Sequence, residues 1–503
     1  MNIIKLKKGY NLNLKGGITD ASIVDAPLAQ SYAIVPDDFS GIVPRLEKKE
    51  GEHVAAGEAV YHDKANEAIK VCSPVCGTVK EVRRGERRKI EAIIIEPNGG
   101  NDCAAIDTSD AKSALLNSGL WALFRQRPYD VVPSPDVTPR DIFVTCFDSA
   151  PLAADWKLFT DGNADIIKKG IQALKSLTSG DVYLGCCPGN VIDSDHTVVF
   201  DGPHPAGNAG IQAANIRPVN KGEVVWTTDI IKKGLQALKS LTSGDVYLGC
   251  CPANVIDSDH TVVFDGPHPA GNAGIQAANI RPVNKGEVVW TTDIITVMRI
   301  GKLMATGKVD FSTIVAVTGE KATKPQLVKC IAGAPVASVV VGAVDVNDAN
   351  TRIISGNVLT GTHIAASDYI RAPYRQITAI PNITVEDEFM GWASVSPKKF
   401  SVYRSFTSWL FGNRKAASFD AKINGGERAI VMAGEYDRMI PMDIYAEFLL
   451  KAIITFDIEK MEQLGIYEVA PEDFALAEYA DTSKLELQSI VRNGLNRLRA
   501  EMC

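Results

Sequence analysis

Residues 165–228 recur almost unchanged as residues 229–292, and this repeat constrains the middle of the chain more than any other feature. The copies are 64 residues long and differ at two positions, where Ile171 and Gly189 correspond to Leu235 and Ala253. Solenoid repeats are shorter, more divergent and usually more numerous, so this pair indicates a recent duplication or an assembly error in the gene sequence. A close-packed domain has one place for such a unit. We therefore predict that one copy, or a hybrid of both, fills that place and that the remainder is appended or looped out.

The pattern of strands and helices predicts a multidomain chain of α/β and β class. Residues 1–100 hold short strands separated by Gly and Pro, and residues 101–310, which contain the repeat, alternate strands with helices. Residues 311–395 are again rich in strands, and residues 396–503 are helical. A chain of 503 residues suits four such domains at roughly 100–200 residues each.

Charge and hydropathy limit the partners of the chain. The net charge of −7 argues against nucleic acid. No segment reaches the about 18 uninterrupted apolar residues of a membrane helix, and the first residues lack the apolar core of a signal peptide. We expect a cytoplasmic chain that has any membrane role through partners.

The ten cysteines do not form a recognisable site. No Cys-x-x-Cys pair occurs, and four of the ten are the two copies of one pair in the repeat. A reduced chain fits this pattern, and zinc or iron–sulfur sites usually need thiolates that are close in sequence. We predict no metal site.

The first hundred residues resemble the barrel-sandwich hybrid domain of biotinyl and lipoyl carriers. The motifs that carry this resemblance are Glu50–Gly57, His62–Ala65 and Ser73–Val79. In that family a hairpin lysine carries the prosthetic group, and the corresponding candidate here is Lys64. The spacing around Lys64 departs from the family pattern, so the alternative is a barrel used for structure and docking.

Six motifs in order resemble the alpha-subunit family of the Na+-translocating NADH:quinone reductase. They are Lys7–Gly9, Ser118–Tyr129, Phe200–Gly207, Ile354–His363, Lys399–Phe406 and Tyr436–Asp443. The resemblance implies a peripheral subunit on the cytoplasmic face of the bacterial inner membrane, within a six-subunit complex that reduces ubiquinone or another quinone with NADH and pumps Na+. NADH oxidation and the flavins would then belong to other subunits. The alternative is a purely structural docking subunit.

This family is distantly similar to the flavoprotein subunit of respiratory complex I. The resemblance implies a Rossmann-like α/β domain over 101–310 and a β-grasp, SLBB-like module over 311–395. The relative has a glycine-rich flavin loop after its Ser-Gly-Leu stretch, whereas here bulky residues follow Ser118–Leu120. The relative's cluster-binding cysteines have no counterpart in Leu464–Phe474. We therefore expect this chain to bind neither flavin nor cluster.

The segment that replaces the flavin loop is one candidate quinone site. Its flat apolar side chains and its arginine donors suit a quinone ring and its carbonyl oxygens. The candidates are Trp121, Phe124, Arg125, Arg127 and Tyr129. The alternative is that the aromatic residues are core and the arginines pair with acids.

A rigid loop that occurs once in each copy of the repeat is the second candidate. His204 with Gly207, and His268 with Gly271, lie in Asp-Gly-Pro-His-Pro-Ala-Gly stretches that would expose a histidine able to deliver a proton. The alternative is a hydrogen-bonded turn. No catalytic residue is assigned.

Overall fold

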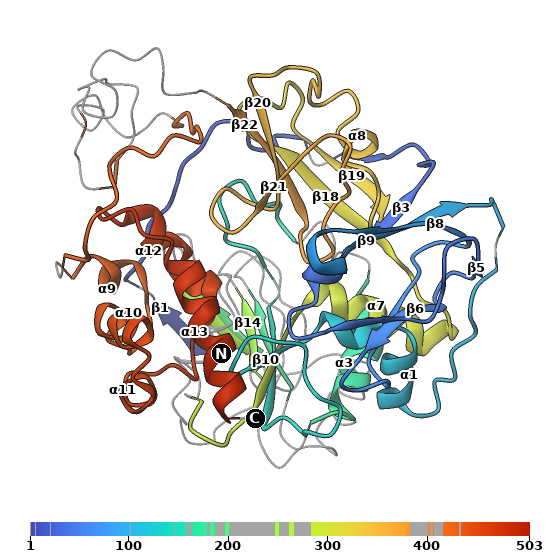
Figure 1. The fold of residues 1–503 in the computed structure, drawn as a ribbon, viewed down its shortest axis with the longest axis horizontal. Coiled ribbons are helices and arrows are strands. Elements are labelled where there is room, and N and C mark those ends of the chain that lie inside the picture. Colours follow the sequence, from blue (N-terminus) through green and yellow to red (C-terminus); the bar gives the residue numbers. More distant parts are fainter. Residues whose placement is uncertain are drawn as a thin grey trace.

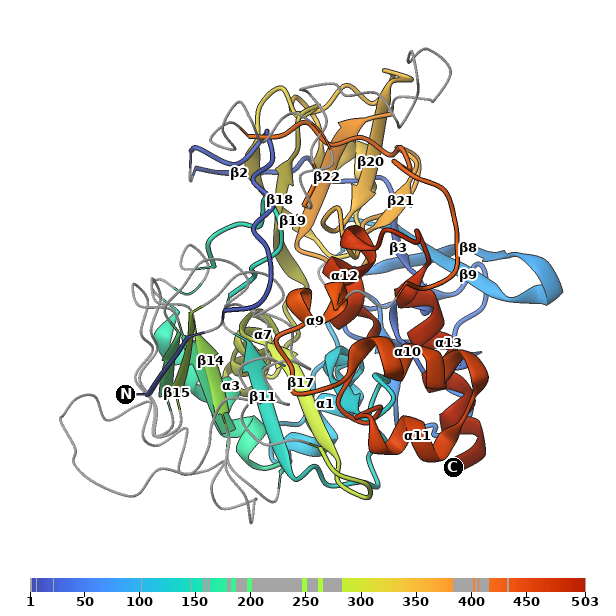
Figure 2. The ribbon, with the colours of Figure 1, turned by 90° about the vertical axis from the view of Figure 1, so that its left-hand side faces the viewer.

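The computed structural model describes most of the chain. The residues outside the description are 1, 6, 21, 101, 146, 157–159, 161–162, 179–181, 187–196, 201–246, 251–260, 266–282, 383–400, 403–405, 407–415, 432–433 and 503. Figures 1 and 2 show three sheets and a helical region arranged around a shared centre. In the described part of the chain, no helix has both the length and the apolarity needed to cross a membrane.

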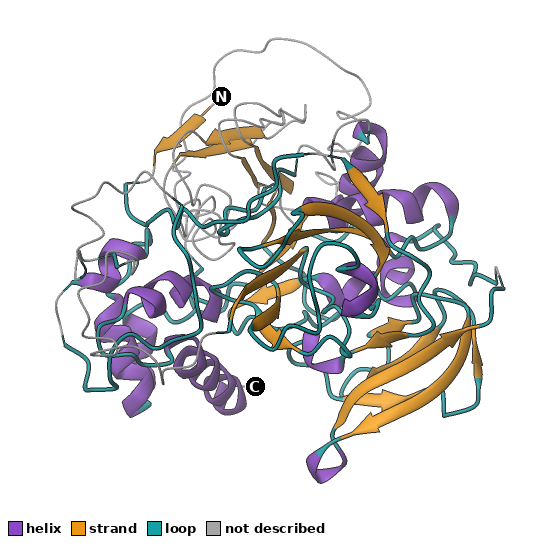
Figure 3. Cartoon of the chain, turned by 90° about the horizontal axis from the view of Figure 1, so that it is seen from above, coloured by secondary structure: helices purple, strands orange, loops and turns teal. Residues whose placement is uncertain are grey.

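The N-terminal barrel consists of two small sheets. One sheet has the order β3-β9-β8-β5 and the other β4-β6-β7. Their bounds are β3 (Tyr32–Ile34), β4 (Pro44–Leu46), β5 (His53–Val54), β6 (Ala59–Asp63), β7 (Lys70–Cys72), β8 (Gly77–Arg84) and β9 (Ile90–Pro97), with 3-10 turns η1 (Pro36–Asp38) and η2 (Glu86–Arg88). The alternating apolar residues of β8 and β9 close the core, where Val79, Ile93 and Ile95 are fully buried. Figure 3 shows the β8–β9 hairpin extending from the molecule with η2 at its tip.

The second domain is built on a mostly parallel eight-stranded sheet of order β1-β13-β15-β14-β12-β11-β17-β10. Among these described strands, only β10 is antiparallel to its neighbour, β17. The strands are β1 (Asn2–Lys5), β10 (Arg125–Arg127), β11 (Asp141–Thr145), β12 (Val182–Cys186), β13 (Thr197–Phe200), β14 (Tyr247–Cys250), β15 (Thr261–Asp265) and β17 (Val289–Asp293). The helices are α1 (Ala111–Asn117), η3 (Leu120–Leu123), α3 (Ala164–Lys175) and α7 (Ile294–Thr306). The parallel ladder between β11 and β17 fits the α/β pattern expected from the sequence.

Helices α3 and α7 cross through glycines. A Cβ atom on Gly170 would lie 1.8 Å from the carbonyl oxygen of Val297, and one on Gly301 would lie 1.6 Å from that of Ile166. Any side chain at either glycine would therefore separate the helices. The N-cap of α7 is the Asp293 carboxylate, which accepts from the backbone N–H of Thr296.

Both copies of the repeat contribute to this sheet. The first copy supplies α3, β12 and β13, and the second supplies β14, β15 and most of β17. Strand β12 pairs with its own duplicate, because Tyr183, Gly185 and Cys186 lie opposite Tyr247, Gly249 and Cys250. The described strands thus differ from a single filled place with a looped-out remainder. A parallel sheet can add strands at its existing ladders, and identical strands match the same neighbours.

The third domain is a six-stranded sheet of order β2-β19-β18-β22-β20-β21, with a short helix α8. Its elements are β2 (Ile23–Asp25), β18 (Ser312–Thr318), β19 (Gln326–Ile331), α8 (Val336–Val339), β20 (Thr351–Ser355), β21 (Thr362–Ile364) and β22 (Gln376–Pro381). It lies at the top of Figure 2, above the strands of the second domain.

The first thirty residues correct the predicted domain boundary of 1–100. Strand β1 pairs with β15 in the second domain, and β2 pairs with β19 in the third, so the barrel strands begin at β3. The sequence identified these residues as strand-forming. Strand periodicity does not say which sheet edge a strand will join, and that choice depends on unpaired edges elsewhere in the chain.

The C-terminal region is helical, as its sequence predicts. Its elements are α9 (Glu435–Met439), α10 (Ala446–Thr455), α11 (Ile458–Gln463), η7 (Pro471–Phe474), α12 (Ala475–Ala480) and α13 (Leu487–Met502). Helix α13 buries one apolar stripe completely, at Leu487, Val491, Leu495 and Leu498. Figure 1 shows these helices side by side along one flank of the molecule.

Candidate functional site at the junction of three domains

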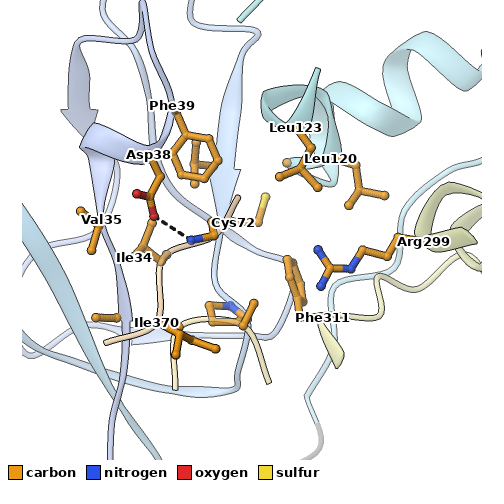
Figure 4. Close-up of a pocket in the computed structure, with 17 residues that line it drawn as sticks. Ile34, Val35, Asp38, Phe39, Cys72, Leu120, Leu123, Arg299, Phe311 and Ile370 are labelled. Atoms are coloured by element: carbon orange, nitrogen blue, oxygen red, sulfur yellow. Dashed lines mark hydrogen bonds between the residues drawn. The ribbon is translucent and has the colours of Figure 1, made fainter. Parts of the chain in front are cut away.

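A largely apolar pocket lies where the barrel, the second domain and the third domain meet (Figure 4). Its empty volume, open mouth included, is about 600 Å³. The barrel contributes η1 and β7, the second domain contributes η3 and α7, and the third contributes the turn after β19. The main lining residues are Ile34, Val35, Asp38, Phe39, Cys72, Gly119, Leu120, Leu123, Arg299, Phe311, Ala332 and Ile370.

The turn between α1 and η3 forms one wall. Ser118 is buried, and its hydroxyl donates to the carbonyl oxygen of Leu115 while accepting from the N–H of Leu120. Gly119 has φ +74°, and a Cβ there would lie 3.0 Å from the backbone nitrogen of Cys72. Only glycine combines that backbone conformation with this close approach to β7. The turn thereby directs Leu120 and Leu123 to the pocket.

Asp38 places a buried carboxylate at the opposite wall. It accepts from the Arg371 guanidinium and, at 2.8 Å, from the backbone N–H of Ala372. Burial raises the pKa of Asp38, and the charge of Arg371 opposes that rise. The carboxylate thus links the barrel to the third domain as well as lining the cavity.

Arg299 places a buried cation at the far side of the pocket. It projects from α7 toward Phe311 (Figure 4), and its Nη2 donates to the carbonyl oxygen of Ser312 at 3.1 Å. Its Nε is buried with no hydrogen-bond partner among the described residues. Burial, followed by the repulsion of Arg375, lowers the pKa of Arg299 to about 10, so the guanidinium is charged at neutral pH.

The Cys72 thiol is a neutral part of the lining. It donates to the carbonyl oxygen of Asn117, and burial raises its pKa to about 12. A thiol with so high a pKa is a poor nucleophile at neutral pH. The pocket therefore offers apolar walls with one acceptor and one cation.

The two aromatic candidates from the sequence lie behind this wall. Trp121 and Phe124 are fully buried, and their ring centroids lie 5.0 and 5.8 Å from that of Trp290. The indole Nε1 of Trp121 donates to the carbonyl oxygen of Pro133 at 2.9 Å. Neither residue lines the pocket; both pack against Trp290 of β17 and hold the turn in place.

The two arginine candidates are bound within the protein. Arg125 donates to three carbonyl oxygens, including that of Asp38 at 2.6 Å. Arg127 donates through Nη1 to the Asp473 carboxylate at 2.8 Å and to the carbonyl oxygen of Glu468 at 2.9 Å. Tyr129 follows with φ +81° and is half-buried. The structure brings Arg125 next to the pocket through Asp38 and directs Arg127 to the C-terminal helices.

The remaining candidates lie elsewhere. Lys64 is exposed at the start of the connection between β6 and β7, and its backbone N–H donates to the carbonyl oxygen of Val43 at 2.8 Å. Its role as a carrier lysine stays a prediction, which the intact mass of the chain purified from its host tests. His204, Gly207, His268 and Gly271 lie outside the described residues.

Asp38 and Arg299 were missed by reasoning from the sequence. Asp38 lies in a Pro-Asp-Asp-Phe turn and Arg299 in an amphipathic helix, where charged residues are usually solvated. The only signal for Arg299 was its place on the apolar face of α7, among residues that are buried.

Comparisons with known proteins agree with this division into domains. Residues 4–98 match the NqrA N-terminal barrel-sandwich hybrid domain, and residues 314–366 match the NQRA C-terminal domain. The NqrA second alpha/beta domain matches twice, over residues 106–231 and 228–309, which separates the two copies of the repeat.

Several curated relatives align over almost the whole chain. The NqrA subunit of the Na(+)-translocating NADH-quinone reductase of Shewanella amazonensis is 30% identical over 511 residues, covering 99% of this chain and 100% of the relative. The chain belongs to the NqrA family of Na+-translocating NADH-quinone reductase subunits. The corresponding proteins of Neisseria meningitidis serogroup C and Serratia proteamaculans are each 29% identical, with the same coverage. The family expected from the six motifs is thus confirmed.

Proposed function

We propose that this chain is a peripheral subunit of a Na+-translocating NADH-quinone reductase and that its junction pocket holds the quinone ring. Its relatives are named as NqrA-type subunits of that enzyme. The Na+ path, NADH oxidation and the flavins then belong to partner subunits, and this chain lies on the cytoplasmic face of the membrane. The observation that carries the quinone site is the apolar pocket with Asp38 and Arg299 on its walls.

The chemistry of the pocket suits a quinone and its quinol. Its volume is within the roughly 300–1,000 Å³ of small-molecule sites. Leu120, Leu123 and Phe311 provide apolar surface, and the unpartnered Nε of Arg299 provides a donor for a quinone carbonyl. Asp38 is an acceptor for the hydroxyl of a quinol. A site with both a donor and an acceptor favours ring orientation over simple hydrophobic capture.

The five sequence candidates support this site from behind. Trp121 and Phe124 hold the wall that carries Leu120 and Leu123, and Arg125 holds the η1 turn that carries Asp38. Arg127 and Tyr129 continue this wall toward the C-terminal helices. These residues therefore act as positioning residues, with the ring contacts made by their neighbours.

We also propose that the second domain is a Rossmann-like relative of the complex I flavoprotein subunit that binds no flavin or iron–sulfur centre. Its parallel sheet and its Ser118–Leu120 turn support that relation. Leu120 and Trp121 are 1% and 0% exposed, so their side chains fill the space in which a cofactor phosphate would approach the turn. Stoichiometric FMN in the purified chain would contradict this.

The experiment for the quinone site is photolabelling of the intact complex. A photoreactive quinone should label this chain at peptides from residues 33–39 or 118–124. Leu123→Trp fills the pocket and should reduce that labelling by about tenfold or more, since displaced contacts cannot re-form elsewhere. Leu116→Trp is the matched control, because Leu116 is also half-buried in the same segment but does not line the pocket. Absence of label on this chain would favour the purely structural docking subunit.

A further inference from the structure

A histidine, a cysteine and an aspartate converge at the base of the β8–β9 hairpin. The possible ligand atoms of His53, Cys76 and Asp102 all lie within 4.8 Å of one another. The thiol of Cys76 is buried, at 6% exposure, whereas His53 and Asp102 are exposed at the rim. We propose that this cluster is a Zn²⁺ site in which three protein ligands leave a fourth position for water.

The distance between the two strongest ligands fits zinc. Cys76 Sγ lies 3.6 Å from His53 Nε2. A tetrahedral zinc ion with a Zn–S bond of about 2.3 Å and a Zn–N bond of about 2.0–2.1 Å holds its sulfur and nitrogen roughly 3.6 Å apart. The pair therefore needs no backbone movement to accept the ion. The exposed carboxylate of Asp102 completes the set by side-chain rotation, and sulfur, nitrogen and oxygen together favour zinc over calcium or magnesium.

The backbone holds each ligand from a different direction. His53 pairs with Thr78 across β5 and β8, and the carbonyl oxygen of Cys76 accepts from the backbone N–H of Asn98 at 3.3 Å. The carbonyl oxygen of Asp102 accepts from the N–H of Ala56 at 3.0 Å. Three segments that are distant in sequence are thus fixed around one point. That separation explains why cysteine spacing alone predicted no metal site.

Binding would replace a proton on sulfur by the metal. In the metal-free chain the thiol contacts His53 Nε2 and, at 3.3 Å, the Oδ1 of Asn98. Zinc binds the thiolate, so one proton leaves Cys76 for solvent as the Zn–S bond forms, and no oxidant or reductant is needed. The ion would tie residues 98–104, the connection from the barrel to the second domain, to strands β5 and β8.

The test is zinc titration of the full-length chain after metal removal, in competition with a chromophoric chelator. We expect one zinc per chain, with at least about tenfold weaker binding in His53→Ala, Cys76→Ser and Asp102→Asn. His62→Ala and Cys103→Ser are matched controls, because each removes the same kind of side chain from the first hundred or so residues without belonging to the cluster, and their binding should be unchanged. Cobalt substitution should give a thiolate-to-metal absorption band that Cys76→Ser lacks.

A second measurement reports the structural effect. Zinc should slow hydrogen exchange of the Ala104 amide, which donates to the carbonyl oxygen of Ala56 at 2.8 Å. Because His53 is exposed, His53→Ala should fold normally and isolates the loss of the ligand. Stoichiometric binding that survives in His53→Ala and Cys76→Ser, or no binding by the wild-type chain, would show that the pair is only a thiol–imidazole hydrogen bond.

Discussion

Buried charged residues connect parts of the molecule that are hundreds of residues apart. Asp38 binds Arg371 and the amide of Ala372, while Arg127 binds the carboxylate of Asp473. The Arg127 and Asp473 side chains are 1% and 0% exposed. Burial lowers the pKa of Arg127, but its neighbouring carboxylates, Asp473 foremost, outweigh burial and raise it. At the residue scale these pairs fix domain positions, because each charge is costly to bury without its partner.

Arg127→Ala should therefore destabilise the chain by about 3–5 kcal/mol, because Asp473 would stay buried without a counter-charge. The free energy of unfolding, measured by denaturant titration, tests this. Arg45→Ala is the control, since Arg45 and its partner Glu67 are 63% and 71% exposed and such pairs contribute less than about 1 kcal/mol. Equal, small effects for both variants would contradict the structural role of Arg127.

The sequence located the candidate site more closely than it identified the residues that line it. The Ser118–Tyr129 segment does form one wall, but helical spacing could not tell which face of η3 would meet Trp290. The partner strand β17 lies far along the chain, and its contact decides that Trp121 is core and Leu123 faces the cavity. Arg127 similarly pairs with Asp473, a partner that local patterns do not reveal.

At the scale of elements, periodicity predicted the barrel strands, the α/β alternation and the C-terminal helices. It did not predict that β1 and β2 would join two different sheets. Nor did it predict the crossing of α3 and α7, which depends on Gly170 and Gly301 facing backbone carbonyls. Such contacts are set by close approach between elements, and a glycine in a helical pattern does not name its neighbour.

Gly301→Ala should weaken the α3–α7 crossing by roughly 1–3 kcal/mol, since the added methyl group would meet the carbonyl oxygen of Ile166 and force the helices apart. Gly426→Ala is the control, because a Cβ at Gly426 meets no atom within 4 Å. Thermal unfolding of the two variants measures the difference. An unchanged or raised midpoint for Gly301→Ala would show that the helices do not pack this closely.

At the scale of the whole molecule, the repeat separates what the sheet contains from what the fold needs. The second alpha/beta domain family matches each copy separately, and both copies place strands in the same sheet. Strands β14 and β15 carry sequences that β12 and β13 already carry. One copy therefore contains every kind of element that the domain requires.

Deletion of residues 229–292 should leave a folded chain. The new junction joins Thr228 to Asp293, so that Val225–Thr228 followed by Asp293 restores the Val-Trp-Thr-Thr-Asp sequence of β17 directly before α7. Helix α3 comes from the first copy and keeps Gly170 against Val297. Because no kind of described element is lost, the deletion variant should unfold cooperatively at the same or a higher temperature. It should also be retained in the assembled membrane complex, as judged by co-purification.

The matched control deletes the first copy, residues 165–228, and leaves the second in its place. The two deletion products differ only at the positions of Ile171 and Gly189, so their stabilities and retention in the complex should agree closely. If both products are insoluble while the full chain is folded, the sheet requires strands from both copies. If both fold, the second set of strands is an addition to a domain that is complete without it, because a sheet that closes its core with one copy gains from the duplicate only further strand pairing.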